Sequence, residues 1–528
     1  MSKKIEKRNR RCPGDLYDIS ISVCKGRQRV HYPKCPVCHY RTETIAASSE
    51  LKKEYNTENI NVEENKTREV VQLSSYQDKA INLNIFKSYD IRGIYPEELN
   101  EYTSEKIGKA TVQFLKSIKD DVKNISVARD VRPSSKSLAK SLIKGITEAG
   151  VNVIDIGEVS TDTTYFAVGH YDYDAGITVT ASHNPSEYNG FKLCHEKAMP
   201  ISFDTGLSKI SEIARQTRLI KSEQPGKIIE KNVLDDYKNH ILSFANNIRP
   251  LKVVIDAGNG MAGKMIPIIF EDLPCKIVPL FFNLDGTFPN HEPNPLKEEN
   301  LRHLQKKVRK TRSHLGAAFD GDADRCSFVD ENGQVIGCDL ITAVIAKELL
   351  QKEKGATIVY DLRSSWVVPE EIKEAGGKPY RERVGHSYIK ATMREKNAVF
   401  GGELSGHYYF KENHYADSGF IALIEVLNVL SRKNVPMSNL FAPLKRYYAT
   451  GEINFKVSDK DKKINQIAEH FKDGKIDFLD GVTVEYKDWW FNVRKSNTEP
   501  LLRLNLEGKT KEMMEKHKKQ VIDIIKEA

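Results

Sequence analysis

The feature that most constrains the fold is a repeated alternation of strand-like and helix-like segments. A strand pattern over 124–130 is followed by a helix pattern over 137–150 and a further strand pattern over 151–157. The same alternation returns over 251–330 and again over 356–390. Repeated βα units of this kind predict α/β domains with parallel or mixed sheets.

The chain after residue 444 follows a different pattern. Strand-like runs succeed one another, and a helical pattern closes the chain; the runs are 453–458, 482–486, 489–496 and 501–508. Several strands followed by a terminal helix predict an α+β domain.

Composition excludes several classes of protein. Of 528 residues, 39% are apolar and 29% charged, and no run of 18 apolar residues occurs, so we expect no membrane span. No apolar segment follows the basic N-terminus, so we expect no secretory signal. The net charge is +8, and residues 1–50 contribute +6 of it (11 basic minus 5 acidic residues). The charge of the chain after residue 50 therefore does not indicate a nucleic-acid partner. Isolated cysteines after the first 40 residues indicate a reducing, cytoplasmic setting.

The first 45 residues contain a candidate zinc site. Cys35 and Cys38 have the two-residue spacing with which one turn presents two thiolates to a tetrahedral ion. The expected zinc ligands are Cys12, Cys24, Cys35 and Cys38, with His31 and His39 as substitutes. A zinc-ribbon-like module this short would depend on Zn²⁺ for folding energy, whereas free cysteines in a basic tail are the alternative. Residues 46–80 are polar, as a flexible linker would be, and the partner of the module stays open.

A serine stands where a strand pattern ends. Residues 177–181 alternate apolar residues with threonine, and 184–190 are rich in turn residues. A scaffold can hold Ser182 rigidly at such a position while leaving it open to substrate. The alternative is a capping serine beside a surface histidine, His183.

Three carboxylates follow the apolar run 315–319. Asp320, Asp322 and Asp324 alternate along an extended segment, where they would repel one another unless a cation neutralised them, and hard oxygen ligands suit Mg²⁺. Arg325 beside the metal would suit an anionic substrate. The spacing also resembles a calcium loop, but Arg325 stands where that loop needs glycine; a solvated acidic turn is the remaining alternative.

A glycine-rich segment, Gly258 to Gly263, matches the dinucleotide-binding fingerprint and would support an NAD-linked oxidoreductase. The acidic segment at 320–325 follows too soon to leave room for the second half of a dinucleotide-binding domain. We therefore interpret the glycines as a turn in an ordinary βα unit.

Two later segments gather groups suited to a sugar phosphate. His386 lies at a predicted strand-to-helix turn, where an imidazole can reach a cleft. Glu403, Ser405 and His407 alternate along a predicted extended segment, and such groups bind hydroxyl-rich ligands. A phosphate would suit the donors of the last motif, for which an Asn-centred turn is the alternative: Arg494, Ser496, Asn497 and Thr498.

In this order the segments resemble the α-D-phosphohexomutase family, in its phosphomannomutase/phosphoglucomutase branch. The match runs from "FKSYDIRGIYPEELN" at residue 86 through "TASHNP", "DGDADR", "GGELSGH" and "RKSNTEP" to near residue 505. The resemblance implies a heart-shaped molecule around a central cleft, with three related α/β domains and a C-terminal α+β domain. The bounds we expect are 1–45 for the zinc module, 46–80 for the linker, and 81–232, 233–335, 336–443 and 444–528 for the four domains.

The resemblance also implies a reaction, the reversible transfer of phosphate between C1 and C6 of a hexose through a phosphoserine at Ser182 and a hexose 1,6-bisphosphate. Mg²⁺ would be held by Asp320, Asp322, Asp324 and a phosphoryl oxygen on Ser182. The implied catalytic residues are Ser182, His183, Lys192, Arg325 and His386, among which Lys192 and His386 match the general acid/base candidates. The implied substrate contacts are Tyr89, Arg92, Asn184, Glu403, Ser405, His407, Arg494, Ser496, Asn497 and Thr498.

Departures from the family pattern bear on the choice of sugar. Leu404 and Phe191 favour a mutase acting on mannose and glucose phosphates, whereas glutamine at position 404 would favour phosphoglucosamine mutase, which stays the alternative. Arg363 stands where some relatives have lysine, and its role stays open. A non-catalytic phosphosugar binder is disfavoured because the serine, metal and acid/base positions are all intact. The sequence leaves the oligomeric state open.

Overall fold

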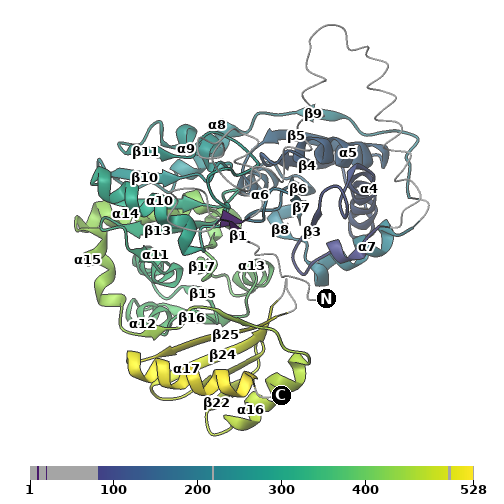
Figure 1. The fold of residues 1–528 in the computed structure, drawn as a ribbon. Helices are drawn as coiled ribbons and strands as arrows, with labels where there is room; N and C mark the ends of the chain where they lie inside the picture. Colours follow the sequence, from purple (N-terminus) through teal and green to yellow (C-terminus); the bar gives the residue numbers. More distant parts are fainter. Residues whose placement is uncertain (1–8, 11–18, 21–80, 217–218, 497–500, 527–528) are drawn as a thin grey trace.

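The computed structural model describes residues 9–10, 19–20, 81–216, 219–496 and 501–526 (Figure 1). Within 1–45 it describes one antiparallel pair, β1 (Asn9–Arg10) and β2 (Ile19–Ser20), which gives the predicted zinc ribbon no support. Several predicted site residues lie outside the described residues: Cys12, Cys24, Cys35, Cys38, Asn497 and Thr498.

The first α/β domain is built on a seven-stranded mixed sheet. Its strand order is β3-β7-β6-β4-β5-β9, with β8 beside β7. The strands are β3 (Ile91–Ile94), β4 (Asn124–Arg129), β5 (Asn152–Glu158), β6 (Ala175–Val179), β7 (Tyr188–His195), β8 (Met199–Pro200) and β9 (Ile228–Glu230). The helices are α4 (Glu101–Ile118), α5 (Ser135–Glu148), α6 (Thr161–His170) and α7 (Ser208–Ala214).

The second domain has a five-stranded sheet of order β11-β10-β12-β13-β14. The strands are β10 (Lys252–Asp256), β11 (Lys276–Leu280), β12 (Leu315–Phe319), β13 (Cys326–Asp330) and β14 (Val335–Ile336). The helices are α8 (Leu234–Leu242), α9 (Ala262–Phe270) and α10 (Glu298–Thr311). Helix α10 buries the stripe Leu301, Leu304 and Val308, as its sequence predicts, because residues three to four apart share one face.

The third domain repeats this topology as β16-β15-β17-β18-β19. The strands are β15 (Thr357–Asp361), β16 (Lys378–Glu382), β17 (Phe400–Gly402), β18 (Tyr408–Phe410) and β19 (Ala416–Asp417). The helices are α11 (Cys338–Lys352), α12 (Val367–Glu374), α13 (His386–Glu395), α14 (Gly419–Lys433) and α15 (Met437–Phe441).

The three sheets are variations on one pattern. In each, the first two pairs of the series β5-β4-β6-β7, β11-β10-β12-β13 and β16-β15-β17-β18 are parallel and the last pair is antiparallel. Strands β6, β12 and β17 therefore occupy equivalent places. The prediction of three related domains with mixed sheets is confirmed.

The fourth domain is an antiparallel sheet covered by two helices, drawn in yellow in Figure 1. Its strands are β20 (Tyr448–Ala449), β21 (Ile453–Phe455), β22 (Lys475–Asp477), β23 (Val482–Glu485), β24 (Trp489–Lys495) and β25 (Leu502–Gly508), and its helices α16 (Lys460–His470) and α17 (Lys511–Lys526). The predicted α+β arrangement is confirmed.

Core packing separates this last domain from the others. One apolar cluster extends from α6 of the first domain through the sheets of the second and third domains to α14. The fourth domain has an apolar cluster of its own. Polar contacts connect the third and fourth domains, including Arg381 Nη1 with Glu485 Oε1 at 2.7 Å and Trp366 N with Glu507 Oε1 at 3.0 Å. Among the described residues, no helix combines the length and apolarity needed to cross a bilayer.

Candidate active site

Ser182 lies on a tight loop just after β6. Its φ is +50°, in the left-handed region, and a buried arginine from the end of the neighbouring strand β4 holds the loop. Arg132 Nη2 donates to the carbonyl oxygens of Ser182 and Asn184 at 2.7 Å each, and Nη1 donates to that of Pro185 at 2.6 Å. With a fourth bond, from Nη1 to the carbonyl oxygen of Tyr188 at 3.2 Å, these charge-assisted contacts fix a backbone that an L-residue rarely adopts.

The side chain of Ser182 meets the second domain. Ser182 Oγ donates to Asp320 Oδ2 at 2.8 Å, and the serine is fully buried. The expected open position is therefore wrong for this conformation, because the loop after β12 covers the serine. A Cβ on Gly321 would come within 2.5 Å of the Ser182 carbonyl oxygen, so the two loops approach this closely only because residue 321 is glycine.

The three aspartates converge from a turn and not from the extended segment we expected. Residues 321–324 form turns and bends, with Ala323 at φ +64°, yet the carboxylates of Asp320, Asp322 and Asp324 lie within 4.8 Å of one another and are buried. Burial, reinforced by the other two carboxylates, raises the pKa of Asp320 well above its ordinary value.

Two oxygens of this cluster make no hydrogen bond. Oδ1 of Asp322 and Oδ1 of Asp324 are buried without one within the described residues, and Asp324 Oδ1 has only a longer ion-pair contact, to His407 Nε2 at 3.6 Å. Leaving buried carboxylate oxygens unpaired is costly, and three oxygen ligands next to one another suit a hard divalent cation. The residues present therefore fit Mg²⁺.

Lys192, on strand β7, brings a positive charge to the three aspartates. Its Nζ lies 2.7 Å from Asp322 Oδ2 and also contacts Asp324 Oδ2. Burial disfavours the ammonium, but these carboxylates more than offset it and raise the pKa of Lys192. The structure thus brings Lys192 to the acidic cluster in its protonated form.

The loop after β17 brings the third domain to the same place. Glu403, Ser405 and His407 sit on a turn, not on the extended segment we expected, and still contact one another: Ser405 Oγ donates to Glu403 Oε2 at 3.0 Å and lies 3.0 Å from His407 Nδ1. His407 Nε2 lies 3.6 Å from Asp324 Oδ1. Burial lowers the pKa of His407, but the bonds to Asp324 and Glu403 outweigh it and raise that pKa to about 9.

Arg325 joins the second and third domains at this point. Residues 325 and 407 form an isolated β-bridge, and Arg325 Nε lies 3.2 Å from His407 Nε2 and 3.7 Å from Asp320 Oδ2. The guanidinium is therefore placed beside the acidic cluster, as predicted.

His386 is the first residue of α13, at the strand-to-helix turn the sequence predicts. Its ring contacts that of Tyr89 edge-on, with centroids 5.3 Å apart, and lies 6.0 Å from the His407 ring. Nδ1 is buried and makes no hydrogen bond within the described part of the chain. Burial and the nearby Lys390 lower the pKa of His386 well below its ordinary value, so this imidazole is neutral.

Two predicted first-domain residues form a pair. Arg92 Nη1 donates to Asn184 Oδ1 at 2.6 Å, and the second nitrogen of the same guanidinium contacts Asp90. His183 lies beside the serine, with Nδ1 3.4 Å from Ser182 Oγ.

The predicted phosphate-binding motif is centred on Arg494, which is buried on β24. Its Nη2 donates to Glu452 Oε2 at 2.8 Å. The same carboxylate meets Arg503 Nη1 at 3.1 Å and Arg363 Nη1 at 3.4 Å, so three guanidiniums surround one glutamate. Ser496 ends the described part of this segment.

The glycines of the apparent dinucleotide fingerprint have a packing role. Gly258 and Gly260 lie in the turn between β10 and α9, and Gly263 lies in the first turn of α9. A Cβ on Gly260 would lie 2.5 Å from the carbonyl oxygen of Gly321 in the acidic loop. This close approach supports the interpretation as a turn in a βα unit.

Sequence reasoning missed Arg132 and the buried pair Lys390 and Asp417. The Nζ of Lys390 lies 2.6 Å from Asp417 Oδ1, and Asp417 Oδ2 lies 3.7 Å from His407 Nε2. Arg132 follows the strand pattern 124–130, and such strand ends carry functional groups in α/β sheets, so its position was a usable signal. No comparable sequence signal pointed to Lys390 and Asp417.

Known proteins match the chain in four consecutive parts. Models of phosphoglucomutase/phosphomannomutase α/β/α domains I, II and III match residues 83–221, 234–333 and 338–447, and the model of the C-terminal domain matches 452–524. The chain belongs to this family. The fold just described is thus that of the phosphoglucomutase/phosphomannomutase family.

Curated family members support the same assignment. The phosphomannomutase of Vibrio cholerae is 41% identical over 438 residues, which cover 81% of this chain and 95% of that protein. The phosphohexose mutases of Xanthomonas campestris are 39% identical, with coverage of 81% and 95%.

Solved structures agree. A phosphoglucomutase/phosphomannomutase family protein of Burkholderia thailandensis superposes with a TM-score of 0.79 at 34% identity, covering 84% of this chain and 98% of that one. The N-acetylphosphoglucosamine mutase of Aspergillus fumigatus, solved with GlcNAc-6P and magnesium, gives a TM-score of 0.58 at 14% identity, covering 87% and 98%. The second likeness shows the fold alone.

Proposed function

We propose that this chain interconverts hexose 1-phosphate and hexose 6-phosphate through a phosphoserine at Ser182. The enzyme is a phosphohexose mutase of the phosphomannomutase type, an isomerase. The observation that carries the role of Ser182 is its 2.8 Å hydrogen bond to Asp320. It places a hydroxyl nucleophile against a buried carboxylate cluster in which two oxygens make no hydrogen bond among the described residues.

Asp320, Asp322 and Asp324 would hold Mg²⁺, together with an oxygen of the phosphoserine. When bound, the cation neutralises charge on phosphoryl oxygens. Arg325, beside Asp320, adds a fixed positive charge from the protein itself.

In the first half-reaction the free hydroxyl of the sugar phosphate attacks the phosphorus on Ser182. The bond between phosphorus and Ser182 Oγ breaks, Oγ leaves with the electron pair and takes a proton from an acid, the hydroxyl proton goes to a base, and a hexose 1,6-bisphosphate forms. The bisphosphate then turns over, and its other phosphoryl group returns to Ser182 with the proton flow reversed. Phosphate must rest on the enzyme between the two halves, which accounts for a serine held this rigidly.

His386 and Lys192 have pKa shifts of opposite sign, which is the pattern of an acid and a base. The neutral His386 has an unpartnered Nδ1 and is the proposed proton acceptor. The protonated Lys192 is the proposed proton donor. His183, beside Ser182 Oγ, orients the nucleophile.

The proposed substrate site is a central cleft to which all four domains contribute residues. We keep the domain bounds that the sequence predicts. Glu403, Ser405 and His407 would bind sugar hydroxyls, and Arg494 with Ser496, Asn497 and Thr498 the phosphate that is not transferred. Arg363 and Arg503 share Glu452 with Arg494, so we add both to the phosphate site. From the first domain, Tyr89, Arg92 and Asn184 would contact the sugar phosphate.

Mannose phosphates are the proposed preferred substrates, with glucose phosphates second. The phosphomannomutase of Vibrio cholerae and the phosphohexose mutases of Xanthomonas campestris support this choice. Hexose 1,6-bisphosphate would act as activator because it regenerates the phosphoserine.

The test measures turnover of mannose 1-phosphate, glucose 1-phosphate and glucosamine 1-phosphate side by side. Mass spectrometry then locates the phosphoryl group after incubation with glucose 1,6-bisphosphate. We expect phosphate on Ser182 and the highest kcat/KM with mannose 1-phosphate. Fastest turnover of glucosamine 1-phosphate would favour phosphoglucosamine mutase, and binding without turnover would favour a non-catalytic phosphosugar binder.

A further inference from the structure

The first turn of helix α6 meets the acidic loop of the second domain. Thr161, the first residue of α6, donates two hydrogen bonds to Asp322, and both residues are fully buried. Thr161 Oγ1 donates to Asp322 Oδ2 at 2.5 Å, and Thr161 N donates to the Asp322 carbonyl oxygen at 3.1 Å. The first N–H groups of a helix have no acceptor inside the helix, so a carbonyl oxygen placed here satisfies one of them. One residue of the first domain therefore holds both the main chain and the carboxylate of Asp322.

The two oxygens of the Asp322 carboxylate have different surroundings. Oδ2 accepts from Thr161 Oγ1 and from Lys192 Nζ, which lies 2.7 Å away. Oδ1 is buried and makes no hydrogen bond within the described residues. Because two donors hold Oδ2, the carboxylate cannot rotate freely, and Oδ1 is the oxygen left for a cation.

Contacts with two other domains support the turn that carries Thr161. The next residue, Asp162, accepts from the Tyr237 hydroxyl of the second domain at 2.7 Å and from Ser418 Oγ of the third domain at 2.6 Å. Its other oxygen accepts from Ser160 Oγ at 2.6 Å. The Thr161 hydroxyl is thus held in place on three sides, as a group that orients a metal ligand must be.

We propose that Thr161 is a positioning residue of the magnesium site, whose hydroxyl orients Asp322 so that Oδ1 stays available to the cation. The inference rests on the proposed function, since it requires that the three aspartates bind Mg²⁺. Thr161 acts on the cation only through Asp322. Lys192 holds the same oxygen but also contacts Asp324 and carries a charge, so replacing Thr161 is the change that leaves the charge of the cluster intact.

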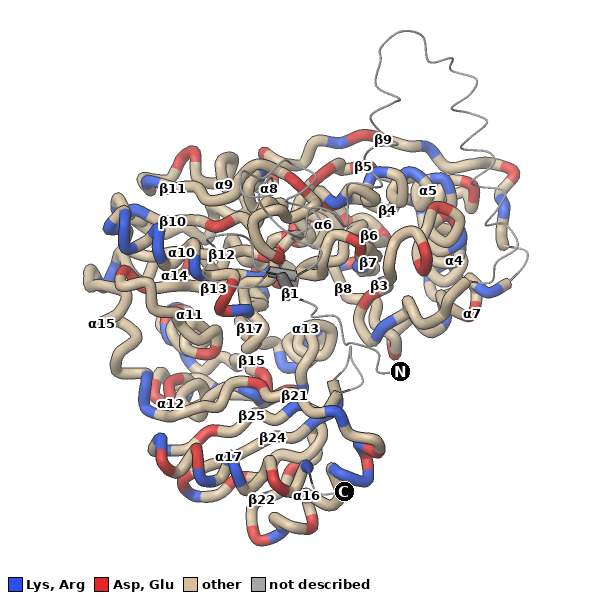
Figure 2. Tube along the Cα trace, in the orientation of Figure 1, with Lys and Arg blue, Asp and Glu red and all other residues tan. Residues whose placement is uncertain are grey.

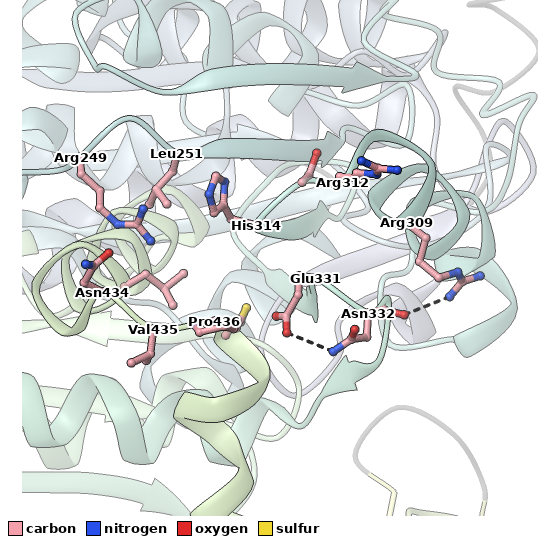
Figure 3. A pocket seen from close by; sticks show the side chains of 13 residues that line it. Arg249, Leu251, Arg309, Arg312, His314, Glu331, Asn332, Asn434, Val435 and Pro436 are labelled. Atoms are coloured by element: carbon pink, nitrogen blue, oxygen red, sulfur yellow. Dashed lines mark hydrogen bonds between the residues drawn. The ribbon is translucent and has the colours of Figure 1, made fainter.

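A similar contact at the far end of strand β13 supplies a matched control. Ser438 of the third domain donates to Glu331 of the second domain through its backbone N, at 3.1 Å, and through its hydroxyl. Glu331 follows β13 and lines a separate cavity between these two domains (Figure 3). Five residues of strand span about 16 Å, so this contact is remote from the acidic loop. It has the same chemistry and also crosses a domain boundary, but it holds no aspartate of the cluster.

The magnesium affinity of the full chain tests the proposal. Calorimetric titration with MgCl₂ gives the Kd of the parent and of each variant, once mass spectrometry shows the same phosphorylation state of Ser182 in all of them. Acidic residues occur in all four domains, as the red segments of Figure 2 show, so about 0.15 M KCl is present to screen weak surface binding. Thr161→Val keeps the shape of the side chain but loses the hydroxyl, and it should weaken Mg²⁺ binding about tenfold or more.

Conservative and control variants separate the hydroxyl from packing. Thr161→Ser keeps the hydroxyl and should bind Mg²⁺ as the parent does. Thr111→Val removes the hydroxyl of a buried threonine on α4 that makes no hydrogen bond within the described residues, and Ser438→Ala removes the control contact. Both should keep the magnesium affinity of the parent. Saturating Mg²⁺ should restore the kcat of Thr161→Val, because the loss is one of affinity.

Each contrary result has its own meaning. Equal magnesium affinity in Thr161→Val and the parent would overturn the role of Thr161 and leave the metal site in place. Equal weakening in Thr161→Ser or in Ser438→Ala would assign the effect to packing or to domain docking, and so overturn it too. No saturable Mg²⁺ binding by the parent would refute the metal site itself and this inference with it. If Thr161→Val does not fold, Thr161→Ala removes the same hydroxyl and is measured in its place.

Discussion

Ser182 Oγ and Asp320 Oδ2, 138 positions apart in the chain, are 2.8 Å apart in the structure. Both residues follow equivalent strands, β6 and β12, of two related sheets. Glu403 follows the third equivalent strand, β17. The proposed active site thus draws on the same loop of three repeated domains, because loops at the carboxyl ends of parallel strands carry functional groups.

Replacing the nucleophile tests the phosphoserine. Ser182→Ala should lower turnover about 10³-fold or more while keeping the unfolding midpoint, since alanine occupies the same space. Ser186→Ala, four residues along the loop, is the matched control and should retain turnover. Near-normal rates in a phosphate-free preparation of the Ser182 variant would refute the mechanism.

Removing one ligand tests the metal site. Mg²⁺ should raise the unfolding midpoint of the parent, because an ion that binds the folded state stabilises it by mass action. Asp322→Asn should reduce that shift and cut kcat far more than it weakens sugar-phosphate binding. Asp272→Asn, on the exposed surface of the same domain, should do neither. Full activity in excess chelator would contradict the assignment.

A buried carboxyl between three domains predicts a pH dependence. Asp162 Oδ2 accepts from Ser418 Oγ at 2.6 Å and from Tyr237 hydroxyl at 2.7 Å, and burial raises the pKa of Asp162 to about 7. The pKa of Asp162 is higher in the folded state than in the unfolded state, where it is near 4. The stability that the protonated Asp162 carboxyl contributes is therefore fully present below about pH 4 and is lost as the pH rises through 7.

Chemical denaturation from pH 5 to pH 8 measures this effect. The parent should lose on the order of 2–4 kcal/mol relative to Asp162→Asn over the titration. Asp172→Asn, at an exposed left-handed position that asparagine tolerates, is the control and should track the parent. Parallel pH profiles for the parent and Asp162→Asn would show that this carboxyl does not titrate there.

The phosphate site predicts a change in KM. Arg494→Lys keeps the charge but loses the planar fork, so KM for the sugar phosphate should rise about tenfold with a smaller change in kcat. Lys495→Gln, on the exposed side of the same strand, should leave KM unchanged. An unchanged KM in Arg494→Lys would remove Arg494 from the site.

We expect the four mutase domains to be active without the N-terminal zinc module. A chain beginning at residue 81 should keep mutase turnover, because the family match begins at residue 83. Metal analysis should find one zinc per full-length chain and none in the shortened one. No zinc in the full chain would refute the metal, and a folded but inactive shortened chain would refute the independence.

The sequence by itself determined the fold class and most of the chemistry. Strand and helix periodicity are local properties, so β6, β12 and α10 could be read from short windows. Ser182, the three aspartates and His386 stand at strand ends, where position along the chain already implies a place at the sheet edge. The five ordered motifs then resemble one family.

Only the tertiary structure decided how these groups pair. Arg132 holds the serine loop from the segment after the neighbouring strand β4, and Lys192 contacts Asp322 across a domain boundary. The extended segments expected at 320–324 and 403–407 are turns, because left-handed residues bend the chain there. Such contacts depend on sheet register and on the packing of whole domains, which bring distant residues within bonding distance and leave no periodic trace in the sequence.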